Sequence, residues 1–168
     1  MSRGAVNFDP AVIWALLEEV KDPEIPVLSI VDLGIARAVQ DTKEGQLEII
    51  ISPTYSGCPA MYMLEEQIKE TLIHHGYPDP VVTTQLSPAW TTDWMTEAGR
   101  QKLTAYGIAP PEKTTANKSV LFGGQKEISC PKCRSQNTEQ ISEFGSTACK
   151  ALYRCLDCLE PFDYFKCI

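Results

Sequence analysis

The sequence has no hydrophobic run long enough to cross a membrane. A transmembrane helix needs roughly 20 consecutive apolar residues, and no stretch of this 168-residue chain approaches that length. Residues 1–7 also lack the apolar segment of a secretory signal. We therefore expect a globular, cytoplasmic protein with no membrane partner.

Basic residues are also scarce. Lys and Arg number 15 against 22 Asp and Glu, so the net charge is −7 at pH 7. Residues 128–168 hold five basic and five acidic side chains, which places the whole excess in residues 1–127. An acidic surface repels a phosphate backbone. We therefore expect no nucleic-acid partner and favour a protein partner or a carrier of positive ions.

Several catalytic signatures are missing. The chain has no Glu-x-x-His pair of the kind that binds a di-iron centre, no dinucleotide fingerprint and no phosphate loop. Its two histidines, His74 and His75, fall at the predicted end of a helix, where they can contact the last carbonyls. A thiol enzyme would need a base beside its nucleophile. The sequence therefore favours a protein without catalytic activity of its own.

Cysteine, in contrast, is plentiful, with seven in the chain. In a cytoplasmic protein this number favours metal or thiol chemistry over disulfides. Two C-x-x-C pairs with 21 residues between them contain Cys130, Cys133, Cys155 and Cys158. Four thiolates in a tetrahedron suit Zn²⁺, and a module of about 40 residues is too small to fold without such help. We predict a structural zinc ribbon.

The remaining part of the predicted ribbon contains two strands and two further cysteines. Residues 138–144 and 151–154 are the expected strands that carry the cysteine pairs. Cys149 and Cys167 fall outside both pairs. Either could replace a ligand of the tetrad, but we expect both to pack against the ribbon. The alternative is a second thiol site or a relay with Cys58.

Cys58 stands apart from the other cysteines. It lies between a predicted strand, residues 47–51, and a predicted helix, residues 60–75. Backbone N–H groups and the helix dipole favour negative charge at that position, which suits a thiolate nucleophile or metal ligand. The alternative is that Cys58 is a small buried residue, as free cysteines often are.

An acidic loop precedes the first predicted hairpin. Two prolines exclude a regular helix between residues 22 and 34, and the loop contains three carboxylates: Asp22, Glu24 and Asp32. They either cap helices or face solvent, or one or more of them approach Cys58. Gly34 at the end of the loop suggests a positive φ or a close backbone approach.

The periodicity of the chain predicts the other elements. A helix should begin at Asp9 and Pro10 and end near residue 21. A hairpin over residues 35–51, an edge strand over 80–86 and a helix ending at Gly107 should follow. We interpret Met61 and Met63 as core residues rather than ligands, and Trp90 and Trp94 as covering either the sheet or a partner surface.

We divide the chain into three parts on these grounds. Residues 1–108 form the predicted α+β domain, residues 109–127 a linker rich in proline, glycine and polar residues, and residues 128–168 the zinc ribbon.

Three motifs resemble a known family. They are Asp22-Pro23-Glu24-Ile25-Pro26, Ser29-Ile30-Val31-Asp32-Leu33-Gly34 and Thr54-Tyr55-Ser56-Gly57-Cys58-Pro59. Residues 10–108 are similar in these motifs to iron–sulfur cluster assembly factors, which include the SufT-type bacterial proteins and eukaryotic cytosolic targeting factors. With the ribbon segments 144–155 and 160–167 added, the whole chain resembles the D subunits of bacterial phenylacetyl-CoA epoxidases.

The resemblance implies an α+β fold in which a small mixed β-sheet carries helices on one side, followed by the β-rich ribbon. It implies that Cys58 is the reactive residue of the first domain and that Asp22, Glu24 and Asp32 belong to its second motif. A transient iron ion or iron–sulfur cluster on these residues would be cargo, and the ribbon would hold structural Zn²⁺.

The same resemblance implies an accessory role in phenylacetate degradation. The epoxidase system contains a di-iron oxygenase and a reductase with an iron–sulfur cluster and flavin, and these are the expected partners. We expect the chain to assist maturation of one of their metal centres rather than to catalyse epoxidation. The alternative is a non-catalytic structural or docking subunit. A homodimer is compatible with both functions.

Overall fold

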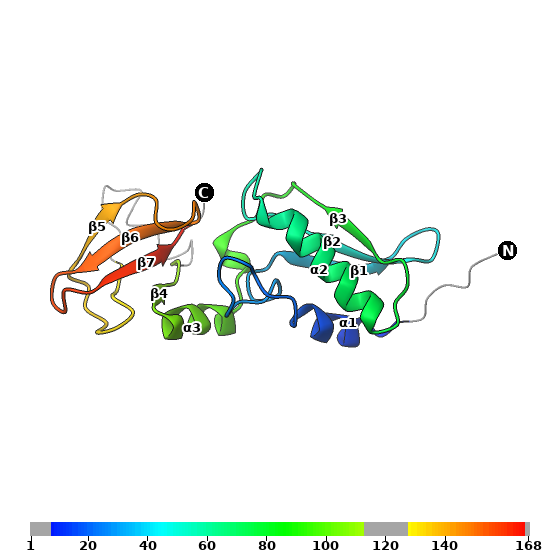
Figure 1. The fold of residues 1–168 in the computed structure, drawn as a ribbon, viewed down its shortest axis with the longest axis horizontal. Helices are drawn as coiled ribbons and strands as arrows, with labels where there is room; N and C mark the ends of the chain where they lie inside the picture. The colour runs from blue at the N-terminus through cyan, green and yellow to red at the C-terminus, as the bar shows by residue number, and fades with distance from the viewer. Residues whose placement is uncertain (1–7, 113–127, 167–168) are drawn as a thin grey trace. The chain divides into compact units, whose positions relative to one another are not determined.

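The computed structural model describes residues 8–112 and 128–166. The chain divides into two compact units, which meet in sequence at Trp90 and Thr91, and each is described by itself below (Figure 1). Most of the predicted linker and Cys167 lie outside the described residues. Within those residues, no helix has both the length and the hydropathy needed to span a bilayer.

The first unit is a small α+β domain. Its elements in chain order are α1 (Pro10–Leu17), β1 (Ala36–Asp41), β2 (Leu47–Ile51), α2 (Ala60–His74) and β3 (Val81–Thr84). The sheet order is β1-β2-β3, in which β1 and β2 are antiparallel and β2 and β3 are parallel. Figure 1 shows α2 lying over this sheet. The expected mixed sheet is confirmed, and β3 is the edge strand that its preceding prolines predicted.

Helix α1 begins as predicted and ends earlier than predicted. The Oδ1 atom of Asp9 accepts a hydrogen bond from the Ala11 N–H at 2.9 Å, and Pro10 occupies the first turn. The helix ends at Leu17, because the next residues pair with the acidic loop instead. The Val20 carbonyl accepts the Ile30 N–H at 3.0 Å.

The core of the first unit lies between the sheet and its helices. Alternate residues of β2 are buried, and α2 buries one stripe containing Leu64, Ile68 and Leu72, as a half-covered strand and an amphipathic helix should. Met63 was expected in the core, but its side chain is 51% exposed. It directly precedes Leu64 and therefore lies off the buried stripe, which recurs every three to four residues.

Trp90 belongs to the core of the first unit. Its side chain is buried, and its Nε1–H donates a hydrogen bond to the Leu33 carbonyl oxygen at 2.9 Å. This bond connects the end of the unit to the acidic loop. Trp94, in contrast, is half-buried and lies in a short 3₁₀ helix, η1 (Thr92–Trp94), of the second unit.

The second unit contains the ribbon and the elements that precede it. After η1 come α3 (Glu97–Tyr106), β4 (Ile108–Ala109), β5 (Thr138–Ser142), β6 (Lys150–Cys155) and β7 (Pro161–Phe165). The sheet order is β4-β7-β6-β5. Helix α3 ends as predicted at Gly107, which has a φ of +91°. The expected β-rich ribbon is confirmed, although its third strand, β7, was not predicted.

Residue 108 was expected to end the first domain and residue 109 to begin the linker, but together they form β4. This strand pairs in parallel with β7, with Ile108 opposite Asp163 and Ala109 opposite Tyr164. Two residues are too few to show the alternation typical of a strand. The prediction of a linker was therefore based on the proline and glycine residues that follow them. The structure thus groups α3 and β4 with the ribbon, and the boundaries at 108 and 128 stay a prediction.

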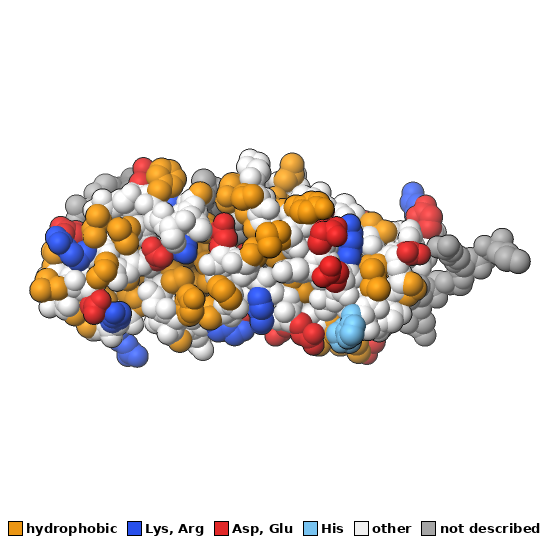
Figure 2. Space-filling model, in the orientation of Figure 1, with side chains coloured by type: hydrophobic (Ala, Val, Ile, Leu, Met, Phe, Trp, Pro, Cys, Tyr) orange, Lys and Arg blue, Asp and Glu red, His pale blue; other side chains and the backbone are white. Residues whose placement is uncertain are grey.

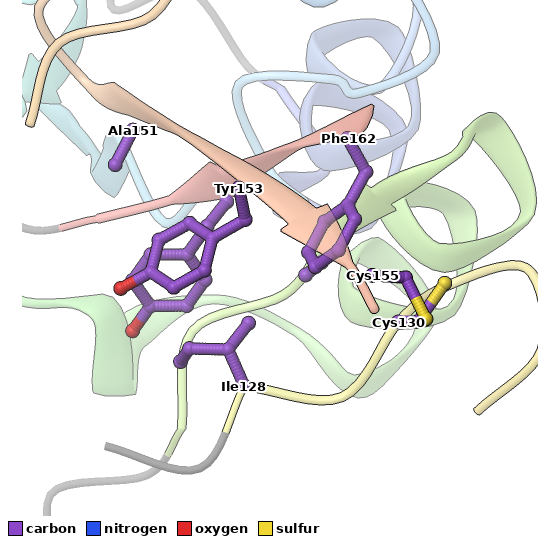
Figure 3. Packing of buried hydrophobic residues seen from close by; sticks show 8 residues of the cluster. Ile128, Cys130, Ala151, Tyr153, Cys155 and Phe162 are labelled. Carbon is purple, nitrogen blue, oxygen red and sulfur yellow. The ribbon is translucent and has the colours of Figure 1, made fainter. Parts of the chain in front are cut away.

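A compact aromatic core supports the ribbon. Tyr153 stacks on Phe162 with ring centroids 5.9 Å apart and meets Tyr164 edge-on at 5.7 Å. Figure 3 shows Tyr153, Phe162 and Ile128 packed together, with Cys130 and Cys155 beside them. Cys130 and Cys155, one cysteine from each C-x-x-C pair, are therefore part of the ribbon's hydrophobic core, and Cys158 packs against it.

Candidate functional site

The four cysteines of the C-x-x-C pairs converge on one point. The sulfur atoms of Cys130, Cys133, Cys155 and Cys158 all lie within 4.8 Å of one another. Each C-x-x-C pair lies in a turn that we call a knuckle. Between the two knuckles, the sulfur atoms of Cys130 and Cys158 are 3.8 Å apart and those of Cys133 and Cys155 are 3.5 Å apart. A tetrahedron with Zn–S bonds of about 2.3 Å has edges of about 3.8 Å. The arrangement therefore fits a tetrathiolate zinc site.

Backbone turns bring these sulfurs together. In the first knuckle, residues 130–135, the Cys130 N–H donates to the Ser135 carbonyl at 2.8 Å. In the second knuckle, residues 155–160, the Cys155 N–H donates to the Glu160 carbonyl at 3.0 Å. Each turn therefore closes around one C-x-x-C pair, and β6 delivers Cys155 directly from the sheet.

Two neighbouring thiols of the cluster, Cys133 and Cys155, have different pKa values. The backbone N–H of Cys158, which points at the Cys155 sulfur at 3.5 Å, is the largest cause that lowers the pKa of Cys155 to about 7. A backbone hydrogen bond with Ser135 lowers the pKa of Cys133, but the proton shared with Cys155 and the neighbouring thiols raises it to about 12. Cys155 is therefore the thiol of this pair that ionises first.

Side chains also connect the two knuckles. Asp157 accepts hydrogen bonds from the Ser135 hydroxyl and, at 2.7 Å, from the Asn137 amide. The first of these bonds is the main cause that holds the pKa of Asp157 below its usual value. Lys132 forms an ion pair with Glu160 at 2.9 Å. The tips of the two knuckles therefore stay together through polar contacts as well as through the cysteines.

Cys58 lies where the sequence placed it, between β2 and α2. Its carbonyl oxygen accepts the Met61 N–H at 3.2 Å, and its own N–H donates to the Tyr55 carbonyl at 3.3 Å. Gly57 before it has a φ of +92°. The residue is partly exposed to solvent.

Three loops leave the same end of the first sheet. The Ser52 N–H bonds to the Ile35 carbonyl at 2.9 Å, which places the end of the acidic loop beside the segment that leads to Cys58. The Gln85 N–H bonds to the Ile51 carbonyl at 2.8 Å, which brings the segment after β3 to that end as well. The topology therefore brings the end of the acidic loop and the start of the segment that leads to Cys58 to the same end of the sheet.

Two of the loop carboxylates shape the loop itself. The Oδ1 atom of Asp22 accepts the N–H groups of Glu24 and Ile25, both at 2.8 Å. Asp32 is buried, its Oδ2 accepts the Ser29 N–H at 3.0 Å, and the Ser29 hydroxyl accepts the Asp32 N–H at 2.9 Å. The sequence offered helix capping or solvent exposure as the alternative to an approach to Cys58, and these two carboxylates instead cap turns of their own loop. A further role of Asp22, Glu24 and Asp32 beside Cys58 stays a prediction.

The first unit offers a single thiol. Among residues 8–112 and 128–166, the ribbon tetrad is the one group of three or more cysteine, histidine or acidic side chains close enough to hold a metal. Cys58 and the loop carboxylates do not form such a group. Cys58 is therefore not part of a preformed group of three or more such ligands within the described residues.

We expect Gly57→Ala to destabilise the first unit by about 1–2 kcal/mol, because a φ of +92° is unfavourable for a residue with a Cβ atom. A methyl group would meet no heavy atom within 4 Å, so backbone strain is the whole effect. Urea unfolding followed by circular dichroism measures it. Ser56→Ala, at the exposed neighbouring position, should be nearly neutral, and equal stability of both variants would contradict the prediction.

Comparison with known proteins finds a different family for each of two parts of the chain. Residues 10–81 match the family described as iron–sulfur cluster assembly protein, and residues 114–166 match the PaaD zinc beta ribbon domain. An Escherichia coli K12 protein, provisionally named as the D subunit of 1,2-phenylacetyl-CoA epoxidase, is 53% identical over the full length of both chains. The chain belongs to the family of phenylacetyl-CoA epoxidase D subunits. The resemblance seen in the sequence is therefore confirmed.

Other relatives of the D subunit family match the first unit. The Bacillus subtilis Fe-S protein maturation auxiliary factor YitW is 33% identical over 84 residues, 49% of this chain and 81% of that one. A crystal structure of a DUF59 domain of unknown function from Bacillus anthracis superimposes with a TM-score of 0.52 and 25% identity, over 56% of this chain and 90% of that one. The first unit thus has a relative that is named for iron–sulfur maturation.

Proposed function

We propose that this protein is an accessory maturation subunit of a phenylacetyl-CoA epoxidase system in phenylacetate degradation. In this proposal the thiolate of Cys58 transiently carries iron or an iron–sulfur cluster to a metal centre of the oxygenase or of the iron–sulfur flavin reductase. The protein works in the cytoplasm and does not catalyse epoxidation. Its membership of the D subunit family and its match to the iron–sulfur assembly family support this role.

The observation that carries the proposal is Cys58 itself, the single, partly exposed cysteine of the first unit, which lies just before α2 and outside any group of three or more potential metal ligands in the described residues. Thiolates are soft ligands that suit iron–sulfur chemistry. One ligand from the carrier is sufficient for delivery, whereas stable storage needs several. The transfer is a ligand exchange without a redox change. The Cys58 thiol gives its proton to solvent as the Fe–S bond forms, and a ligand of the acceptor later replaces the sulfur, which is protonated again.

The ribbon has a different role in this proposal. Cys130, Cys133, Cys155 and Cys158 would hold Zn²⁺, which supplies folding free energy when bound. Four protein ligands leave no open position for a substrate. The ribbon is therefore a folded platform that docks a partner, while the first unit handles the cargo.

A thiol enzyme is the weaker explanation because Cys58 lacks a histidine base. His74 and His75 lie at the opposite end of α2. A helix of 15 residues spans roughly 22 Å at 1.5 Å per residue. His75 is also engaged, with its Nδ1 atom 2.8 Å from the Thr71 carbonyl oxygen at the helix end.

A transfer assay with purified proteins tests the proposal. The full chain is loaded anaerobically with ferrous iron and sulfide, separated from excess reagents and mixed with the metal-free oxygenase or reductase. We expect iron to move to one of these components from wild-type protein, and at least tenfold less from Cys58→Ser. Equal transfer by both proteins would show that Cys58 is not the carrier. No transfer by either would favour the structural or docking role.

A further inference from the structure

The segment that precedes the ribbon, residues 92–112, is attached to the ribbon's sheet. It contains η1, α3 and β4, and it lies between the two family matches, which end at residue 81 and begin at residue 114. β4 pairs in parallel with β7, and Ala109 of β4 is buried in the same hydrophobic cluster as Cys130 and Cys155. The segment therefore shares a core with two of the four cysteines of the metal site.

Arg100, in the first half of α3, is a buried cation without an acidic partner. Figure 2 shows basic side chains that stand out from the visible face of the molecule, as solvated cations normally do. Arg100 is only 7% exposed, and within the described residues it forms no ion pair. Lys150 is also buried, but its ammonium group lies 3.7 Å from the Asp163 carboxylate. Because burial of an unpaired charge is costly, Arg100 must be held by other contacts.

The guanidinium of Arg100 connects the two ends of the segment. Its Nη2 donates a hydrogen bond to the Thr92 carbonyl oxygen at 2.6 Å, and its Nη1 donates to the Pro111 carbonyl oxygen. Its Nε–H is buried and has no hydrogen-bond partner among the described residues. Thr92 begins η1, and Pro111 is the second residue after β4. One side chain therefore ties the start of the segment to the strand that joins the ribbon, and we call these two hydrogen bonds the Arg100 clamp.

The ribbon reaches the clamp through Tyr164 of β7, which packs edge-on against Tyr153 in the aromatic core. Burial is the main cause that raises the pKa of Tyr164 to about 12. The Glu112 carboxylate raises this pKa further, and the Arg100 guanidinium and a hydrogen bond with the Glu112 backbone lower it. The Tyr164 hydroxyl is thus bonded to the residue that directly follows Pro111. A continuous set of contacts leads from the aromatic core of the ribbon to the clamp.

Helix α3 depends on the elements at its ends. It has 10 residues, and isolated helices shorter than about 12–15 residues are only marginally stable in water. Its buried residues are Gly99, Arg100 and Leu103, so Leu103 is the one large apolar side chain that it buries. Such a helix needs support from outside, and the clamp and β4 supply it.

We propose that the fold of residues 92–112 depends on zinc in the ribbon, through the Arg100 clamp. Structural zinc contributes folding free energy to the ribbon when bound, β7 of the ribbon holds β4, and Arg100 extends this support across α3 to Thr92. Arg100 is thus a positioning residue, and the inference rests on the structural zinc of the proposed function. Thr92 lies two residues after Trp90, the last residue of the first unit, so loss of zinc would release the chain from that point onward.

Hydrogen exchange of the full chain, followed by mass spectrometry, tests the zinc dependence. Zinc-loaded protein is compared with protein stripped by a chelator under reducing conditions. Without zinc, the amides of α3 should exchange at least tenfold faster together with those of β6 and β7, whereas β1 and β2 should be unchanged. Continued protection of α3 after β6 and β7 have lost theirs would overturn the inference. Protein that binds no zinc would refute the zinc site itself, and the inference with it.

Substitution of Arg100 tests the clamp. Arg100→Met keeps a long side chain but removes both hydrogen bonds, so in zinc-loaded protein α3 should lose protection while β6 and β7 keep theirs. Because linked equilibria are reciprocal, this variant should also bind zinc about tenfold more weakly in competition with a chelator, as loss of hydrogen bonds from a charged group predicts. Arg100→Lys keeps the charge and one donating group, and its effects should be intermediate.

Gln101→Met is the matched control, because Gln101 is the exposed neighbour of Arg100 on the same helix, and it should match wild type. Wild-type exchange and zinc affinity in Arg100→Met would overturn the role of the clamp. Cys58→Ser should keep both properties, so failure of the clamp and failure of the carrier mechanism are distinguishable.

Discussion

Replacing Cys133 by serine is expected to remove zinc and to unfold the ribbon. Cys133 is an exposed member of the cysteine tetrad, so the substitution removes a thiol without opening a cavity in the core. A neutral hydroxyl is a poor substitute for a thiolate, and structural zinc contributes about 10–16 kcal/mol in small metal-dependent domains. The ribbon core contains few large side chains, chiefly Ile128, Tyr153, Phe162 and Tyr164. It cannot compensate for a loss of that size.

Two measurements follow the zinc-ligand prediction. Metal analysis should find about one zinc per chain in wild type and almost none in Cys133→Ser. Hydrogen exchange should show loss of amide protection in β5, β6 and β7, while β1 and β2 of the separate first unit stay protected. Cys149→Ala is the control, because Cys149 is a buried ribbon cysteine outside the tetrad. Bound zinc and protected ribbon amides in Cys133→Ser would refute the prediction.

Much of the fold could be predicted because the local signals agree with the tertiary structure. Asp9 and Pro10 specify a helix start, and the alternation of residues 47–51 specifies a strand with one buried face. The C-x-x-C spacing specifies a shared metal site, and the four sulfurs do converge. In each of these cases a few neighbouring residues determine the conformation.

The misplaced elements depend on contacts that are distant in sequence. β4 forms because Ile108 and Ala109 pair with β7, which lies more than 50 residues later in the chain. Helix α1 is short because Val20 hydrogen-bonds to Ile30. The positive φ of Leu159 was also missed. Its position directly after a C-x-x-C pair was the available signal, since a tight knuckle turn requires a positive φ there.

The candidate site, like the fold, could be predicted only in part from the sequence. The sequence placed Cys58 between a strand and a helix, and the structure does so too. It could not decide whether the acidic loop caps turns or supplies ligands, because both uses need the same carboxylates. The structure shows that Asp22 and Asp32 cap turns of the loop. It also shows that the loop ends, and the segment leading to Cys58 begins, at the same end of the sheet. That proximity follows from strand pairing, which the motifs do not encode locally.

Cys58→Ser is expected to reduce the metal content of one epoxidase component as far as deletion of the whole protein does. The reason is that the first unit presents one thiol and no multi-ligand metal group within the described residues. Serine keeps the size of the side chain at this partly exposed position, so the fold should be retained while the soft ligand is lost. A chemical carrier should therefore fail completely, whereas a scaffold should be unaffected.

The experiment produces the oxygenase and reductase in cells that contain wild-type protein, Cys58→Ser, Cys149→Ala or no copy, and measures their iron and acid-labile sulfide. If both iron and sulfide fall in the reductase, a cluster is the cargo. If iron alone falls in the oxygenase, its di-iron centre is the target. Cys149→Ala should match wild type, since Cys149 is buried in the ribbon. Unchanged metal in the deletion would reject maturation, and loss with Cys149→Ala but not with Cys58→Ser would move the reactive thiol to the ribbon.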